Sequence, residues 1–170
     1  MQKLPRVPRK YVLFVGSIQP RKNLTTLLSA WRKIRNEFND LWLVIAGGMG
    51  HVFRADQLEE VGRVCFLGYV SDDDLPGLYA NAELLVLPSH DEGFGLPVLE
   101  AMACGTPVIA NAVGGLLSLV EHERTGYLVA DRDSEVFARH TAHLLDHSDV
   151  AEQMGAADRK STRLNSSHRT

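Results

Sequence analysis

Two glutamates, Glu92 and Glu100, flank a glycine-bracketed turn that leads into a predicted helix in the segment EGFGLPVLEAMACGTP, residues 92–107. Pro97 suits the first turn of that helix, because the N–H that proline lacks would be unpaired there. No Ser, Thr, Asp or Asn stands at positions 94–96 to cap the helix, so its first N–H groups are free to bind an external anion such as a phosphate. Carboxylates accept hydrogen bonds from sugar hydroxyls. The segment therefore predicts a phosphate-binding turn flanked by two carboxylates that accept hydrogen bonds from hydroxyls. This combination suits a nucleotide sugar.

Two cations, Arg21 and Lys22, stand ahead of a second predicted helix start. Positive charges oppose the helix dipole at that position unless an anion binds nearby. The alternative interpretation is a solvated surface pair. The corresponding alternatives are a solvated loop acid for Glu92, an exposed helical acid for Glu100, and an ordinary tight turn for the glycines.

The E-x7-E spacing inside EGFGLPVLEAMACGTPVIA resembles the donor-site signature of retaining GT-B glycosyltransferases, in particular glycosyltransferase family 4, also called group 1. The resemblance covers about residues 11–157 and includes the segments VGSIQPRKN, LVIAGG, FLGYVSDDDLPGLYANAELLVLPS, VGG and TGYLV. It implies the C-terminal, donor-binding half of a GT-B enzyme that moves a sugar from a nucleotide diphosphate sugar to a hydroxyl acceptor. It also implies catalysis without a bound metal, no cofactor, and a missing N-terminal acceptor-binding domain as partner. We therefore expect this chain alone to bind donor weakly and to transfer little or no sugar.

The resemblance implies a role for each candidate site residue. Glu92 would contact the transferred sugar and stabilise positive charge at its anomeric carbon, while Glu100 would bind the ribose hydroxyls of the nucleotide. Lys22 would bind phosphate, with Arg21 as a second cation, so that the two neutralise the leaving diphosphate. The other donor-binding positions are Gly16, Gly48 and, through backbone N–H groups, Gly93, Phe94, Gly95 and Leu96.

Two segments depart from the pattern of the family. Many members carry an arginine directly after the first glycine, where this chain has Ser17, and we expect Arg21 to take over that charge. Members often have GGLPE where this chain has GGLLS at residues 114–118. Gly114 and Gly115 are still expected to allow close backbone approach to the donor.

Short apolar runs alternate with amphipathic segments along the chain, and this pattern predicts the elements that position the site. Strands are expected at residues 11–15, 41–46, 64–67, 84–87, 107–110 and 127–129. Helices are expected at residues 24–34 with Asn23 as cap, at 55–62, 71–82, 96–103 and 116–121, from Asp131 or Asp133 to His147, and from Asp149. The alternation predicts a doubly wound, Rossmann-like α/β fold, with a mostly parallel sheet covered by helices on both faces. Ligands bind outside the carboxyl ends of the strands in such sheets, so the segments 16–22, 47–50, 88–95 and 111–115 should converge on one site.

The chain of 170 residues has the size of one domain, with 45% apolar and 23% charged residues. We expect residues 10–157 to form the domain and residues 1–9 to be a linker remnant. Residues 158–170 are expected to be a disordered, non-native tail that resembles adaptor-derived sequence read through into the frame. The net charge is −3, and the last twelve residues hold four basic side chains and no acid, so the rest is more acidic than the total. This balance argues against a nucleic-acid partner.

The expected compartment is the cytoplasm. No apolar run is long enough to span a membrane, and no signal peptide opens the sequence. Cys65 and Cys104 are expected to be free thiols, as in a reducing compartment. Peripheral membrane contact of the full enzyme stays open.

Two clusters of possible metal ligands receive other interpretations. The acids at 72–74 stand at a predicted helix start, where they complement the dipole. Histidines 140, 143 and 147 share one helix face with no other ligand type in sequence, and we interpret them as solvent-exposed. We expect no metal site.

A non-catalytic nucleotide-sugar binding module is the alternative function. A sugar-nucleotide epimerase or a plain dinucleotide-binding domain fits less well, because Gly16 is followed by Ser17, Ile18 and Gln19 rather than by a G-x-G-x-x-G pattern. The sugar, the base and the acceptor are left open.

Overall fold

The computed structural model describes residues 6–50 and 54–167, and its centre is a single parallel sheet. The strands are β1 (Tyr11–Val15), β2 (Trp42–Ala46), β3 (Val64–Gly68), β4 (Leu84–Leu87), β5 (Val108–Asn111) and β6 (Gly126–Val129). Their order across the sheet is β3-β2-β1-β4-β5-β6, and every neighbouring pair is parallel. The central strands consist of buried apolar residues apart from the half-buried Val15 and the polar Asn111 at the ends of β1 and β5, as expected for a sheet that is covered on both faces.

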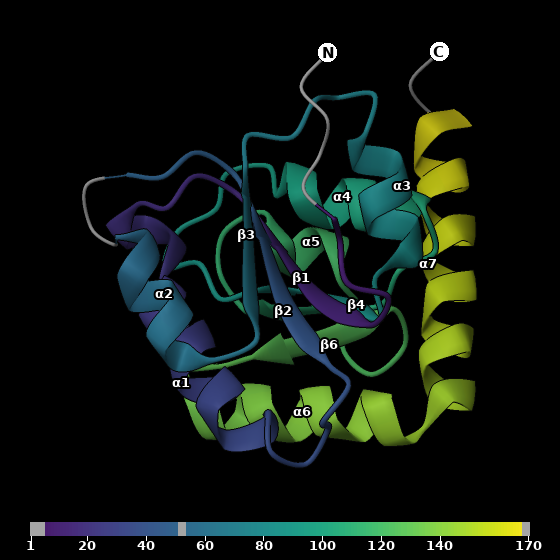
Figure 1. Cartoon of the computed structure of the whole chain (residues 1–170). Helices are drawn as coiled ribbons and strands as arrows, with labels where there is room; N and C mark the ends of the chain where they lie inside the picture. Colours follow the sequence, from purple (N-terminus) through teal and green to yellow (C-terminus); the bar gives the residue numbers. More distant parts are fainter. Residues whose placement is uncertain (1–5, 51–53, 168–170) are drawn as a thin grey trace.

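Helices cover both faces of this sheet (Figure 1). They are the short 3-10 turn η1 (Pro20–Lys22), α1 (Leu24–Ile34), α2 (Ala55–Val61), α3 (Leu75–Asn81), α4 (Leu96–Ala103), α5 (Leu116–Leu119), α6 (Ser134–Asp146) and α7 (Ser148–Ser167). Right-handed crossovers place the helices that follow β1 and β2 on one face and those that follow β3, β4 and β5 on the other. The chain then returns through α6, which packs on α1, and α7, which packs on α4. The predicted Rossmann-like α/β fold is confirmed.

The predicted cap of α1 is wrong in its mechanism. The helix begins directly after Asn23, but the Asn23 side chain makes no capping hydrogen bond and its backbone is left-handed, with φ of 57°. Instead, Asn23 Nδ2 donates to the Pro88 carbonyl at 2.9 Å, and Asn23 Oδ1 accepts from Thr26 Oγ1 at 2.9 Å. A hydrogen bond to the distant residue Pro88 therefore takes the place of the local capping hydrogen bond.

The start of α3 also differs from the prediction. The Ser71 hydroxyl donates to the Asp74 carboxylate at 2.8 Å, so this pair closes a turn and the helix begins only at Leu75. The cap of α6 is Asp133, which accepts a hydrogen bond from the Glu135 N–H at 2.9 Å.

The expected disorder after residue 157 does not hold for residues 158–167, because they continue α7. The helix lies against α4, and Gly155 packs so closely on the Gly105 carbonyl that a Cβ would stand 2.0 Å from its oxygen. Asp158 is buried, and this burial raises its pKa to about 8, although the Thr125 hydroxyl and the Arg124 guanidinium oppose the shift. Residues 168–170 lie outside the described residues, as do residues 1–5 of the expected linker remnant.

Candidate functional site

The reversal of strand order lies between β1 and β4, the two central strands. β1 pairs with β2 on one side and with β4 on the other, and the chain leaves the two strands in opposite directions. The loops after these strands therefore flank a crevice at the carboxyl edge of the sheet, where ligands of such folds bind. Every segment that the sequence predicted to converge follows a strand at this edge.

Backbone hydrogen bonds tie the loops after β1, β2 and β3 together. The Gly16 N–H donates to the Ala46 carbonyl at 2.9 Å, and the Gly47 N–H donates to the Gly68 carbonyl at 2.7 Å. Gly47 has φ of 148°, and a Cβ there would stand 1.9 Å from the Gly16 carbonyl oxygen. Only glycine allows this crossing of two loops.

Two buried asparagines clamp the loop after β4. Asn23 Nδ2 donates to the Pro88 carbonyl, while Asn111 Nδ2 donates to the carbonyls of Pro88 and Ser89 at 2.7 and 2.9 Å. The Ser89 hydroxyl is itself buried and has no hydrogen-bond partner among the described residues. Sequence reasoning missed this clamp. The sequence feature that could have revealed the clamp is Asn111, an asparagine at the end of an apolar strand.

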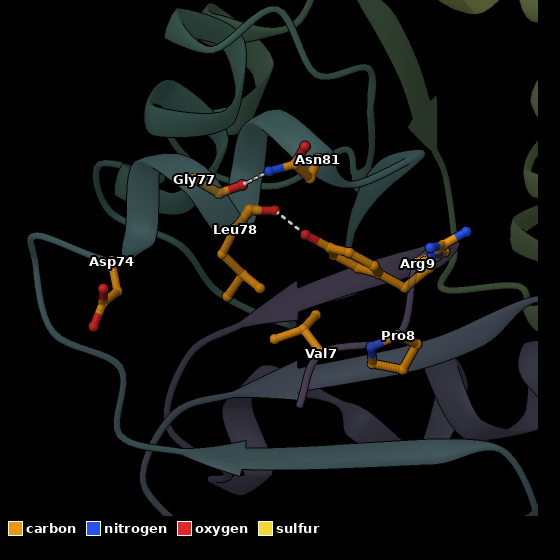
Figure 2. A pocket seen from close by; sticks show the side chains of 8 residues that line it. Val7, Pro8, Arg9, Asp74, Gly77, Leu78 and Asn81 are labelled. Carbon is orange, nitrogen blue, oxygen red and sulfur yellow. Dashed lines mark hydrogen bonds between the residues drawn. The ribbon is translucent and has the colours of Figure 1, made fainter. Parts of the chain in front are cut away.

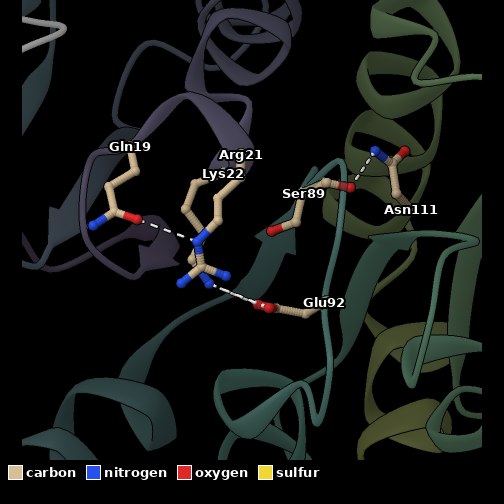
Figure 3. A network of polar contacts seen from close by, with 6 residues as sticks. All are labelled: Gln19, Arg21, Lys22, Ser89, Glu92 and Asn111. Atoms are coloured by element: carbon tan, nitrogen blue, oxygen red, sulfur yellow. Dashed lines mark hydrogen bonds and ion pairs between the residues drawn. The ribbon is translucent and has the colours of Figure 1, made fainter.

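Lys22 and Glu92 form a buried ion pair at the crevice (Figure 3). The Lys22 ammonium lies 2.7 Å from one oxygen of the Glu92 carboxylate and 3.3 Å from the other. The two residues are only 7% and 5% exposed, so each charge depends on the other for compensation. Arg21 beside them is exposed, and its Nε donates to the Gln19 side chain at 3.1 Å. Of the three residues predicted as catalytic, Lys22 and Glu92 are therefore in direct contact, while the Arg21 side chain bonds to Gln19.

The glycine pair after β5 packs against the loop that carries Glu92. The Gly115 N–H donates to the Glu92 carbonyl at 2.9 Å. A Cβ would stand 2.2 Å from the Glu92 carbonyl oxygen at Gly114, and 2.1 Å from the Gly93 carbonyl oxygen at Gly115. The close approach is thus to the chain itself, and it fixes the backbone that carries Glu92.

The start of α4 is open, as the sequence predicted. Gly95 precedes the helix with φ of 63°, and among the described residues no side chain caps it. No described atom lies within 4 Å of the position that a Cβ would take at Gly93 or at Gly48. Phe94 and Leu96 are 85% and 58% exposed. Gly95 itself is buried beside Leu116, and Pro97 has no N–H, so the exposed backbone of this helix start is that of Gly93, Phe94 and Leu96. N–H groups at a helix start carry partial positive charge, which favours an anion.

Glu100 lies further along α4 and faces α3 rather than the ion pair. One of its carboxylate oxygens accepts a hydrogen bond from the Tyr79 hydroxyl at 2.8 Å. Burial raises the pKa of Tyr79 strongly, and the hydrogen bond and the charge of Glu100 raise it further. Glu100 itself is exposed, at a hollow that Asp72, Pro76 and Cys104 also line.

A second hollow lies between the N-terminal segment and α3, lined by Val7, Pro8, Arg9, Tyr11, Asp74, Gly77, Leu78 and Asn81 (Figure 2). It contains none of the predicted site residues. Within the described ranges, no group of three or more His, Cys, Asp or Glu side chains could hold a metal ion. None of the helices in the described part of the chain is long and apolar enough to cross a membrane.

A six-stranded parallel sheet with helices on both faces, and with charged side chains and an open helix start at its switch point, defines a Rossmann-like α/β domain. The chain belongs to the glycosyl transferases group 1 family, whose model matches residues 1–161. It is similar to the D-inositol 3-phosphate glycosyltransferase of Salinispora tropica, with 42% identity over 151 residues, which are 81% of this chain and 31% of the relative. The chain spans about a third of the length of the first curated relatives that it matches.

Solved structures of glycosyltransferases share the fold. Sucrose-phosphate synthase of Thermosynechococcus elongatus superposes with a TM-score of 0.81 at 33% identity, over 92% of this chain and 41% of that one. The HepE protein of Anabaena in complex with UDP gives a TM-score of 0.80 at 25% identity, over 89% of this chain and 43% of that one.

Proposed function

We propose that this chain is the C-terminal, donor-binding half of a retaining glycosyltransferase that transfers a sugar from a nucleotide diphosphate sugar to a hydroxyl acceptor. One observation carries the proposal: Lys22 and Glu92 meet, buried and oppositely charged, at the switch point beside the uncapped start of α4. A diphosphate binds to cations and free N–H groups, and a sugar binds to a group that accepts hydrogen bonds from its hydroxyls. The UDP complex of the similar HepE protein supports the assignment of the ligand class.

The ion pair balances the buried charges of the crevice within the chain itself, because Lys22 and Glu92 compensate each other. A bound diphosphate offers Lys22 a stronger anionic partner, which releases the Glu92 carboxylate to accept hydrogen bonds from the sugar and to stabilise positive charge at its anomeric carbon. Arg21 and the first N–H groups of α4 add to the stabilisation of the leaving diphosphate. Neither a metal ion nor an organic cofactor takes part in this scheme.

The reaction exchanges one bond at the anomeric carbon for another. The bond from the anomeric carbon to the diphosphate oxygen breaks, and a bond to the acceptor oxygen forms on the same face of the sugar. The acceptor hydroxyl loses its proton to the departing phosphate oxygen. The retained configuration follows from the family resemblance of the E-x7-E segment.

The acceptor site belongs to the part of the enzyme that this chain lacks, since the chain spans about a third of its curated relatives. The isolated chain should therefore bind donor weakly and transfer little or no sugar. Both cysteines are free, which fits the proposed cytoplasmic location of the enzyme. Robust transfer by residues 1–157 alone would contradict the assignment of the acceptor site.

Calorimetric titration of the 170-residue chain with UDP-, GDP- and ADP-sugars tests the binding function. At least one donor should bind, and Arg21→Ala should weaken it roughly tenfold by removing an exposed cation without touching the buried pair. Lys10→Ala is the matched control, because Lys10 stands just before β1, at the opposite edge of the sheet. No heat and no thermal protection with any donor would refute the proposal.

The non-catalytic binding module remains the second candidate, because the open start of α4 alone could hold a donor. Glu92→Ala in a reconstituted full-length protein separates the two candidates. Loss of turnover with donor still bound favours the enzyme. Absence of turnover in the parent protein favours the module.

A further inference from the structure

Tyr79 is a buried side chain whose only polar atom points at a proposed ligand-binding residue. Its ring is 1% exposed within α3, and its hydroxyl donates to one oxygen of the exposed Glu100 at 2.8 Å. A phenol buried to this degree needs a hydrogen-bond partner, and a carboxylate on the adjacent helix is a strong one. The pair links α3 to α4 across 21 positions of sequence.

The Tyr79 hydroxyl occupies a fixed place. The ring is enclosed in the hydrophobic core, and the Tyr79 backbone carbonyl accepts a hydrogen bond from the Thr106 hydroxyl at 2.6 Å. Burial, together with the neighbouring Glu100, raises the pKa of Tyr79, so the phenol stays protonated and remains a donor. A rigid donor of this kind holds an exposed, rotamer-rich glutamate in one orientation before any ligand arrives.

The geometry points to Tyr79 as a positioning residue: it fixes one oxygen of Glu100 so that the other reads the ribose diol of the nucleotide. This inference rests on the proposed function. An ionised carboxylate only accepts hydrogen bonds, and Tyr79 engages one of its two oxygens. The other oxygen keeps both lone pairs for ribose hydroxyls. Preorganisation of this kind lowers the entropy that binding must otherwise remove.

A purely structural clamp between α3 and α4 would require the same hydrogen bond, so the test must measure ligand choice as well as stability. Tyr11 supplies a matched control. Tyr11 is equally buried, and its hydroxyl donates to the Leu78 carbonyl in α3 at 2.6 Å, but it does not contact Glu100. Tyr79→Phe and Tyr11→Phe each remove one buried phenol hydroxyl and keep the ring.

The experiment measures the affinity of the 170-residue chain for UDP, GDP and ADP and for their 2′-deoxy counterparts. The parent chain should prefer the ribose form about tenfold, since a hydrogen bond to a charged group is lost with the 2′-hydroxyl. Tyr79→Phe and Glu100→Gln should both lower this preference several-fold, because each weakens the ribose form more than the deoxy form, which has already lost the contact of its 2′-hydroxyl. The double variant should lose no more than either single one, and Tyr11→Phe should keep the parent preference.

The outcomes separate this inference from the function on which it rests. A parent chain that binds no diphosphate contradicts the proposed function and the role of Tyr79 together. A parent chain that prefers ribose, with the same preference in Tyr79→Phe, overturns the positioning role alone. Equal thermal destabilisation of both phenylalanine variants with an unchanged ribose preference identifies a structural clamp.

Discussion

The crevice between β1 and β4 and the histidine face formed by β6 and α6 each gather several titratable side chains, but they hold them differently. The crevice joins opposite charges from separate loops, with Lys22 and Glu92 buried at 2.7 Å. The histidine face consists of His122, Tyr127, His140, His143 and His147, whose rings make stacked and edge-to-face contacts. Tyr127 and His140 are nearly parallel, with centroids 4.1 Å apart, and His143 stacks on His147 at 4.4 Å.

The two regions also differ in how the backbone enforces them. At the crevice, asparagine clamps and glycine crossings fix the loops, so the charged side chains have little freedom. On the histidine face the rings come from one strand, its preceding turn and one helix, and their packing stabilises that local contact. Titratable residues are dense in both places. The candidate site differs from the histidine face because its backbone holds opposite charges together.

Breaking the buried pair should have the largest effect. Lys22→Met leaves the Glu92 carboxylate buried without compensation and should lower the free energy of unfolding by about 3–5 kcal/mol. Urea unfolding of the single variant and of the double variant Lys22→Met, Glu92→Met checks this, because the double variant should recover most of the loss. Lys33→Met breaks the exposed pair with Glu135 and should cost less than about 1 kcal/mol. A loss that small for Lys22→Met would contradict a buried, mutually dependent pair.

Substitutions at the glycines of the crevice should have a smaller effect on stability than breaking the ion pair. Gly115→Ala drives a Cβ toward the Gly93 carbonyl oxygen and should cost about 1–3 kcal/mol of stability by overpacking. Gly93→Ala meets no described atom within 4 Å, so its stability should stay near that of the parent while donor affinity falls. Unfolding midpoints and donor titrations of the two variants test this separation. Equal stability of both would show that the loop after β5 does not support the Glu92 backbone.

Local patterns in the sequence were sufficient to predict the fold and the convergence of the loops that carry Lys22 and Glu92, but not the ion pair between these two residues. Apolar runs stopped by glycine or proline located all six strands to within about one residue, and parallel topology then brought the loops to one edge. The partners of the side chains were not predictable in this way. Asn23 forms a tertiary bond in place of a helix cap, and Glu100 meets a tyrosine from another helix.

The other features that the sequence did not reveal have the same physical origin. Gly114 and Gly115 are constrained by a chain segment about 20 positions earlier, and their spacing alone does not reveal whether a ligand or the protein fills that space. The end of α7 has few apolar residues, so its composition predicted disorder. The helix is instead supported by contact with α4, which a sequence pattern within residues 158–167 does not encode. Tertiary contacts override local preference in each case.

The histidine face should show the smallest effect, and only below neutral pH. Burial lowers the pKa of His140, and the charges of His122, Arg139 and His143 lower it further, while Glu123 opposes the shift. The unfolded chain therefore binds the proton at a higher pH than the folded chain does. The stability that His140 contributes is complete above about pH 6.5 and is lost as the pH falls through the lowered pKa of the folded state.

His140→Phe keeps a ring against Tyr127 but removes the titration, so it should flatten this part of the pH dependence. The measurement compares urea midpoints at pH 7.5 and pH 5.5 for the parent, for His140→Phe and for His147→Phe, which changes an exposed ring outside the Tyr127 stack. Carboxylates that do not act on His140 contribute equally to all three proteins, so the difference between the two variants isolates His140 together with its coupling to Glu123. If both variants kept the parent's change of urea midpoint with pH, protonation of the histidine face would make no contribution to stability. Donor affinity should not change in either variant, because neither ring reaches the crevice where opposite charges meet.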